Sequence, residues 1–290
     1  SKEYRNTQIL ANLVCGILAL LALLPFILLI VASLTDNTWA TANGFSFFPG
    51  SWSLDAYRYI AVQWATVGRA YLMTIVVTII GTAASIMVTT LFAYAICQQE
   101  VPGMKLLSFM MVFTMLFNGG LVATYYSYVN YFHVRNTIWA LILPSVFSVW
   151  NMFLLRTYFS AISPSLYEAA ILDGANYFQI FWRITVPLSK TTLLTVGMMY
   201  ALAFWNDWWN ALMFINSKDL FPLQYYLYNI LSNVNAVSSG RIPAGASGIQ
   251  LPAETVKMAV TMITIGPIIF LYPFVQKYFV NGIMTGAVKE

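Results

Sequence analysis

Long apolar stretches dominate this sequence and leave it few possible folds. A helix that crosses the hydrocarbon core of a bilayer needs about 20 mainly apolar residues. Six stretches meet this length, at residues 9–34, 69–96, 106–128, 137–155, 191–215 and 258–279. The first is too long for a secretory signal and lacks a small-residue cleavage site, so we expect it to be retained. The sequence therefore predicts an all-α, polytopic integral membrane protein with six transmembrane helices.

The composition agrees with a protein that is largely surrounded by lipid. Hydrophobic residues make up 60% of the 290 positions, charged residues make up 8%, and the mean hydropathy is +0.72. A soluble domain carries about 25% charged residues. The net charge of +4 is too small and too dispersed to indicate nucleic-acid binding. Neither cysteine has metal-ligand spacing and the chain holds a single histidine, so we expect no metal site.

No long repeat or low-complexity linker divides the chain, and we expect one transmembrane domain over residues 1–290 with a core at about 66–280. An even number of spans places both termini on one side, and the basic residues weakly favour the cytoplasmic side. The spans then leave a cytoplasmic loop at 161–190 and an external loop at 216–257. Within the third span, Asn118-Gly119-Gly120 predicts a helix break or a close-packing site.

A polar segment at residues 163–190 interrupts the apolar pattern and carries the most informative residues. Ser165 and Glu168 have the spacing of a capping box, which predicts the start of a short helix. Gly174 can turn the chain, and Asn176 begins a second capping pattern. The sequence therefore predicts two short helices that are joined at a glycine. The first carries two adjacent alanines, which allow another surface to approach closely.

These residues resemble a loop in a known family of membrane proteins. Glu168-Ala169-Ala170, Gly174 and the ending from Ile184 to Pro187 recur together in the EAA cytoplasmic loop of binding-protein-dependent ABC importers. Three further segments are similar to maltose-type carbohydrate permeases, at residues 118–121, 136–144 and 280–289. The similarity is to the smaller permease, in the branch that serves complex oligosaccharides. It implies the MetI-like fold of a type I ABC importer permease, in a bacterial plasma membrane with both termini in the cytoplasm.

The resemblance implies that a separate ATPase docks on this loop. The residues that it assigns to coupling are Glu168, Ala169, Ala170, Asp173, Gly174, Ala175 and Phe178. Glu168 would pair with a basic residue of the ATPase. The C-terminal tail, represented by Gly286 and Lys289, would enter the interface between two ATPases, or alternatively is a frayed end. From the residues alone another reading of the loop stays open, in which Glu168 only caps its own helix.

Energy for transport must come from another chain. No G-x-x-x-x-G-K-[ST] motif is present to hold phosphate, and no nucleophile or acid–base pair suggests an enzyme. By the resemblance, ATP and magnesium are bound by the partner ATPase and this chain holds no cofactor. It would work with two ATPase subunits, a homologous second permease subunit and an extracellular solute-binding protein. Together they would import an oligosaccharide or a polysaccharide fragment by alternating access.

Two other functions are considered from the sequence. One is an ABC permease for a solute that is not a carbohydrate. The other is an ion-coupled secondary transporter, which would need intramembrane acids or helices broken near the bilayer midplane. Asp207 is the main candidate for such an acid.

A polar and aromatic cluster lies late in the fifth span, where residues 204–210 read Phe-Trp-Asn-Asp-Trp-Trp-Asn. A carboxylate at this depth is costly unless it faces protein or water. Indole rings beside amide and carboxylate groups suit a sugar. The candidate residues of a substrate pathway are therefore Trp205, Asn206, Asp207, Trp208 and Trp209, together with Asn151 in the fourth span. The alternative is an aromatic belt at the outer membrane interface.

Overall fold

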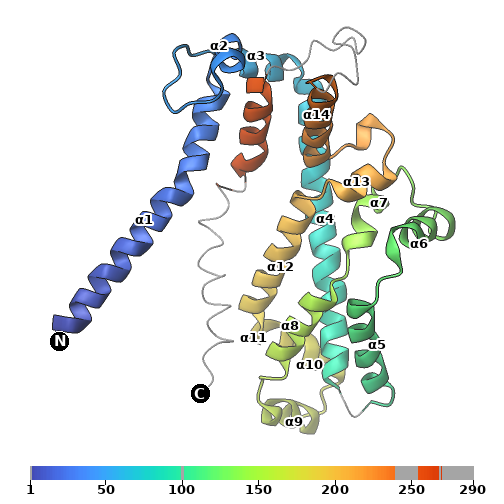
Figure 1. The fold of residues 1–290 in the computed structure, drawn as a ribbon. Coiled ribbons are helices and arrows are strands. Elements are labelled where there is room, and N and C mark those ends of the chain that lie inside the picture. Colours follow the sequence, from blue (N-terminus) through green and yellow to red (C-terminus); the bar gives the residue numbers. More distant parts are fainter. Residues whose placement is uncertain (1, 99–100, 239–253, 268, 270–290) are drawn as a thin grey trace. The chain divides into compact units, whose positions relative to one another are not determined.

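The described residues form helices joined by turns and a few longer connections (Figure 1). The computed structural model describes residues 2–98, 101–238, 254–267 and 269, and the all-α class is confirmed. The chain divides into two compact units. The first contains residues 1–68 and 226–269, and the described part of the second is residues 69–225. The single domain over residues 1–290 stays a prediction.

The first unit contains one long helix and several shorter ones. Its elements are α1 (Lys2–Ser33), α2 (Asn37–Asn43), α3 (Asp55–Val62), the first residues of α4 (Trp64–Cys97), most of α14 (Leu223–Ser238) and a helix at residues 254–267. The apolar part of α1, Tyr4–Ser33, has none of its span-length window buried inside the protein.

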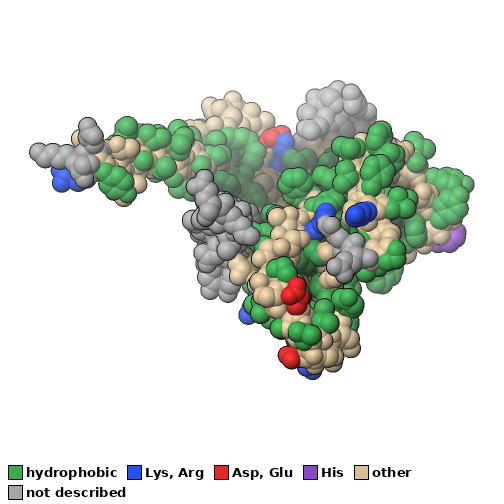
Figure 2. Space-filling view, turned by 90° about the horizontal axis from the view of Figure 1, so that it is seen from below, with side chains coloured by type: hydrophobic (Ala, Val, Ile, Leu, Met, Phe, Trp, Pro, Cys, Tyr) green, Lys and Arg blue, Asp and Glu red, His purple; other side chains and the backbone are tan. Residues whose placement is uncertain are grey.

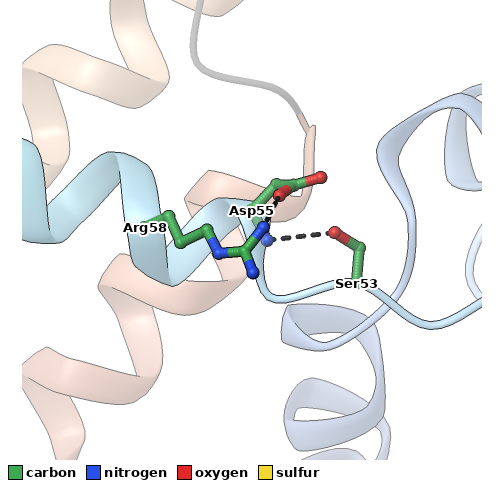
Figure 3. Close-up of polar contacts among 3 residues, drawn as sticks. All are labelled: Ser53, Asp55 and Arg58. Atoms are coloured by element: carbon green, nitrogen blue, oxygen red, sulfur yellow. Dashed lines mark hydrogen bonds and ion pairs between the residues drawn. The ribbon is translucent and has the colours of Figure 1, made fainter.

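Side chains order the connection that follows α1. The Asp36 carboxylate accepts hydrogen bonds from the Thr38 hydroxyl and from the Trp39 N–H, the latter at 3.0 Å. These bonds lower the pKa of Asp36 and cap the start of α2. Figure 3 shows the corresponding start of α3, where Ser53 Oγ accepts the Asp55 N–H at 3.0 Å and Arg58 pairs with the Asp55 carboxylate at 3.2 Å.

The second unit holds the remaining elements. They are the rest of α4, α5 (Met104–Leu116), α6 (Gly120–Tyr126), η1 (Ser127–Tyr131), α7 (Trp139–Ile142), η2 (Leu143–Ser145), α8 (Val149–Phe159), α9 (Pro164–Leu172), α10 (Tyr177–Ile180), η3 (Phe181–Thr185), α11 (Val186–Leu188), α12 (Lys190–Trp205), α13 (Trp209–Phe214), η4 (Lys218–Leu220) and the start of α14.

Two helices, α1 and α4, are each long and apolar enough to cross a membrane. Two bent pairs meet the same test, the pair of α5 with α6 and η1, bent by 117°, and the pair of α7 and η2 with α8, bent by 52°. This search covers the described residues alone, and the expected sixth span at 258–279 is described only at residues 258–267 and 269. The count of six spans therefore stays a prediction.

Three of the expected spans are not single helices. The stretch 106–128 breaks at Asn118-Gly119-Gly120, as the sequence predicted, because Gly120 takes a left-handed φ of +86° and its N–H is bound by the Asn118 side chain at 2.8 Å. The stretch 137–155 breaks before Val149, where Ser148 caps the start of α8. The stretch 191–215 breaks after Trp205.

Helices α4 and α12 pack closely at two glycines. A Cβ added at Gly81 of α4 would lie 2.7 Å from the Phe204 ring of α12. In the reverse sense, a Cβ added at Gly197 of α12 would lie 2.7 Å from Cδ1 of Ile86. Each helix thus places a bulky side chain against the bare backbone of the other, as small residues allow in membrane helices.

Candidate functional site

The polar segment forms the two short helices that the sequence predicts, but the first begins earlier than expected. The N-cap of α9 is Ser163, and Pro164 occupies the first helical position, where its missing N–H costs nothing. The expected capping box of Ser165 and Glu168 is therefore wrong: the Ser165 hydroxyl instead contacts the Ser163 hydroxyl at 2.8 Å. Glu168 lies in the middle of the helix, and its side chain does not cap it.

The turn after α9 is a Schellman motif that requires a glycine. Gly174 has a φ of +82° and donates its N–H to the Ile171 carbonyl at 3.0 Å, while Ala175 donates to the Ala170 carbonyl at 2.9 Å. These two bonds satisfy carbonyls that the end of a helix otherwise leaves free. The predicted turn at Gly174 is confirmed, with Asp173 as the last residue before it.

The second short helix starts at the predicted capping box. The Asn176 side chain accepts the Gln179 N–H at 2.8 Å, and the Gln179 side chain accepts the Asn176 N–H at 2.9 Å. The chain then continues through α10, the π turn η3 and α11 before α12 begins. Pro187, which has no N–H to donate, is the second residue after the π turn and disturbs the regular bonding pattern.

The tip of this segment combines acidic and apolar side chains that are exposed. We call it the coupling surface, and it comprises Leu166, Glu168, Ala169, Ile171, Leu172, Asp173, Gly174, Tyr177 and Phe178. Leu172 is 87% exposed and Phe178 is 67% exposed. Of the seven predicted coupling residues, Ala170 and Ala175 are half-buried and the other five are exposed. Figure 2, seen from the end at which α9 lies, shows hydrophobic side chains over much of this face, with acidic and basic ones scattered among them.

Exposed side chains of this size need a partner or lipid to cover them. The two acids beside them favour a protein partner over hydrocarbon, which is a costly environment for a carboxylate. Among the described residues, no basic side chain forms an ion pair with Glu168. Its carboxylate is therefore available to a cation on another chain.

The inner face of the segment is packed and polar contacts hold it. Ile180 and Phe181 are 2% and 3% exposed. The Tyr167 hydroxyl of α9 contacts the Thr185 hydroxyl of η3 at 3.2 Å, and burial raises the pKa of Tyr167. The Tyr94 hydroxyl of α4 donates to the Tyr177 carbonyl at 3.1 Å. Sequence reasoning missed Tyr94, because its partner lies 83 residues away and nothing in its neighbourhood marks it.

The predicted pathway residue Asp207 lies directly before Trp208, the N-cap of α13, and binds the first N–H groups of that helix. Its carboxylate accepts the N–H groups of Trp209 and Asn210 at 3.0 and 3.1 Å and the Asn210 side-chain amide at 2.6 Å. The same amide donates to the Ser145 hydroxyl at 3.0 Å, which ties α13 to η2. These bonds start α13 anew after the break and give the carboxylate the polar partners that it needs away from water.

The other predicted pathway residues separate into buried and exposed ones. Trp205 is 9% exposed and packs edge-on against Tyr71 at 6.4 Å between ring centroids. Trp208 and Trp209 are exposed and meet each other at an interplanar angle of 88°. The Asn206 side chain accepts the Gln224 side-chain amide at 3.1 Å. Asn151 is buried on α8, a separate element.

A second residue that sequence reasoning missed is Asn136. It has a φ of +56°, its N–H donates to the Phe214 carbonyl at 2.9 Å, and its side-chain oxygen accepts the N–H groups of Asn216 and Ser217 at 3.1 and 2.8 Å. It thus closes the end of α13. An asparagine between two helical stretches is the available signal, because asparagine tolerates the left-handed region better than most residues.

The remaining predicted site residues cannot be placed. Gly286 and Lys289, assigned to an ATPase interface, lie outside the described residues, and so does the part of the external loop at 239–253. Among the described residues, no three His, Cys, Asp or Glu side chains gather as metal ligands would.

The chain, including this loop, is similar to a known family of membrane proteins. Residues 101–285 match the family model described as "Binding-protein-dependent transport system inner membrane component". The chain belongs to this family. Its matched region contains the whole coupling surface, and membership favours the importer over the alternative of an ion-driven secondary transporter. Proteins of this family are integral to the membrane and act with other components of ABC transport systems.

Two curated relatives from Bacillus subtilis (strain 168) align over nearly the whole chain. The "Polygalacturonan/rhamnogalacturonan transport system permease protein YtcP" is 36% identical over 271 residues, covering 93% of this chain and 94% of its own. The "Protein LplC" is 35% identical over 283 residues, covering 95% and 94%. The similarity to these two relatives therefore extends over nearly the full length of each of them.

A solved structure has the same fold. It is described as a bacterial ABC transporter involved in the import of the acidic polysaccharide alginate, and it is 29% identical to this chain. It matches with a TM-score of 0.80 over 96% of this chain and 98% of its own. This likeness, together with the family, confirms the expected type I importer permease fold.

Proposed function

We propose that this chain is one of two homologous permease subunits of a bacterial ABC importer for an oligosaccharide or a polysaccharide fragment. The cargo class is supported by the names of its relatives, which concern polygalacturonan, rhamnogalacturonan and alginate. In this proposal the solute-binding protein delivers the sugar from outside and the permease pair carries it across. Both termini lie in the cytoplasm.

The proposal rests mainly on the exposure of the coupling surface. This surface places an exposed Glu168, which has no ion pair among the described residues, in the middle of α9 beside exposed leucine and phenylalanine side chains. In the proposal an ATPase subunit covers the apolar residues and supplies a cation for Glu168. Such a charge-assisted contact becomes costly to break once it is removed from water, because the remaining partner is left unpaired.

In this proposal the ATPase subunits move the permease through contacts with the coupling surface. Two ATPase subunits bind ATP and magnesium, close on each other, and displace the docked helices α9 and α10. The spans then rock between outward-open and inward-open states. We further assign the tail residues Gly286 and Lys289 to the interface between the ATPases, on the strength of the family resemblance.

A sugar pathway past the exposed indoles Trp208 and Trp209 is part of the same proposal. Aromatic faces stack well against the apolar faces of sugar rings. Asp207, Asn206 and Trp205 would then support these indoles, because their polar or ring contacts are already made to other residues of the chain. Asn151 stays a candidate on α8.

The test is to substitute Glu168 in the assembled complex. Glu168→Ala removes a charge-assisted bond, worth about 1.5–3 kcal/mol, so ATPase retention or substrate-stimulated hydrolysis should fall by about tenfold or more. Asp55→Ala serves as the matched control, because Asp55 is also an exposed acid and, among the described residues, its carboxylate pairs with Arg58. Normal ATPase assembly and normal stimulated hydrolysis in Glu168→Ala would show that the coupling assignment is wrong.

A further inference from the structure

We infer that Tyr94 is a positioning residue that fastens the second coupling helix to α4 and so carries the motion of the docked loop into the transmembrane part. This inference rests on the proposed function, because it presupposes an ATPase on the coupling surface. No feature of the Glu-Ala-Ala pattern points to Tyr94, which lies near the C-terminal end of α4.

Tyr94 holds α10 by two different contacts. Its hydroxyl donates to the main-chain carbonyl of Tyr177, the first residue of α10, at 3.1 Å. Its ring packs against the Phe181 ring with 5.1 Å between centroids, and both side chains are buried. Because the bond goes to main chain, it restrains the helix itself rather than a side chain that could change rotamer.

The contact lies directly behind the surface that a partner would press. Tyr177 and Phe178 of the second short helix are exposed, whereas Ile180 and Phe181, one turn further on, are buried. A force on the exposed face is therefore carried by the buried face, and Tyr94 packs there. The chain itself joins the segment to α8 before it and to α12 after it, and Tyr94 adds a direct contact with α4.

The same force then reaches two helices at once, because α4 and α12 are interlocked. The glycines described above let Phe204 and Ile86 pack against bare backbone. The Thr89 and Tyr200 hydroxyls join at 2.7 Å, and Tyr200 also accepts the Ser148 N–H at 2.9 Å. Close-packed side chains transmit displacement because they cannot be compressed. The loop is attached to α8 and α12 by the chain and to α4 by Tyr94, so its displacement reaches the interlocked pair α4 and α12 from both members.

The test uses the assembled complex with a fluorescent amino acid in place of the exposed Trp209, the first residue of α13, which reports on the segment that follows α12 without any need to know the cargo. Magnesium, ATP and vanadate trap the ATPases closed. Tyr94→Phe removes the hydroxyl and keeps the ring, whereas Tyr126→Phe removes an exposed hydroxyl on α6 as a matched control.

We expect Tyr94→Phe to retain the ATPase subunits and their basal hydrolysis. The vanadate-induced fluorescence change, measured as an equilibrium between states, should shrink by about two- to tenfold, as the loss of one hydrogen bond implies. Tyr126→Phe should behave as the parent. A merely structural role of Tyr94 would lower assembly and leave the fluorescence change of the assembled fraction intact, and that result would overturn the inference.

A double-mutant cycle of Tyr94→Ala with Phe181→Ala gives the second measurement. If the Tyr94 and Phe181 rings act through their mutual contact, the second substitution should add little to the loss of fluorescence change caused by the first. Additive losses would count against a shared role of the two rings. Loss of ATPase binding in the parent complex itself would instead refute the proposed function, so the two failures are distinguishable.

Discussion

Gly81 gives the sharpest prediction about how the second unit is held together. Its added Cβ would lie 2.7 Å from Phe204 Cζ and 2.8 Å from both Cε atoms, so an alanine must displace an aromatic ring that is itself buried. Overpacking of this kind costs about 1–3 kcal/mol. Alanine regains about 1 kcal/mol relative to glycine inside a helix. The net expectation for Gly81→Ala is therefore a loss of about 1 kcal/mol.

Two other glycines supply matched controls with the same chemical change. At Gly197 the added Cβ meets Cδ1 of Ile86, a terminal methyl group that can rotate away, and at Gly16 it meets nothing within 4 Å. Gly197→Ala should thus be close to neutral, and Gly16→Ala neutral or stabilising.

The assay is equilibrium unfolding in mixed detergent micelles, read as the fraction of denaturing detergent at the midpoint. Gly81→Ala should unfold first of the three, and adding Phe204→Leu should recover part of its loss. Equal midpoints for Gly81→Ala and Gly16→Ala, or purely additive losses in the double variant, would refute the close packing of α4 on α12.

Two further predictions concern the helix caps. Asn176→Ala should weaken the start of α10 by about 1 kcal/mol, seen as faster amide hydrogen exchange across α10, while Asn176→Asp should keep the protection; unchanged exchange in the alanine variant would mean that the capping box contributes nothing. Asp207→Ala should likewise release the start of α13, whereas Asp207→Asn should retain most of its order because an amide oxygen can still accept the N–H groups of Trp209 and Asn210. Equal hydrogen exchange of α13 in both variants would contradict the cap.

The features that the sequence predicts well are those that depend on neighbouring residues. The Asn176 capping box and the Gly174 turn each close within a few residues, so local chemistry is sufficient to place them. The start of α9 was placed two residues too late. Pro164 favours the first helical position and so points to Ser163 rather than Ser165 as the N-cap, a signal that the spacing of Ser165 and Glu168 obscured.

The break after Trp205 is harder to foresee, because apolar composition continues through it. Asp207 followed three residues later by Asn210 has the spacing of a helix start, but the same residues also suit a membrane interface. Only the bond from Asn210 to Ser145, 65 residues away, distinguishes the two. Tyr94 is similar: a tyrosine near the end of an apolar run acquires its role from a main-chain carbonyl on a distant helix.

The central claim is that the coupling surface is where an ATPase docks. A photo-crosslinking amino acid in place of Phe178, which is 67% exposed, tests it directly in the assembled complex. The same amino acid in place of Leu54, an exposed residue in the connection between α1 and α3, is the control. The account predicts a crosslink to the ATPase subunit from position 178 and none from position 54. No crosslink from position 178 in a complex that retains its ATPase would contradict it.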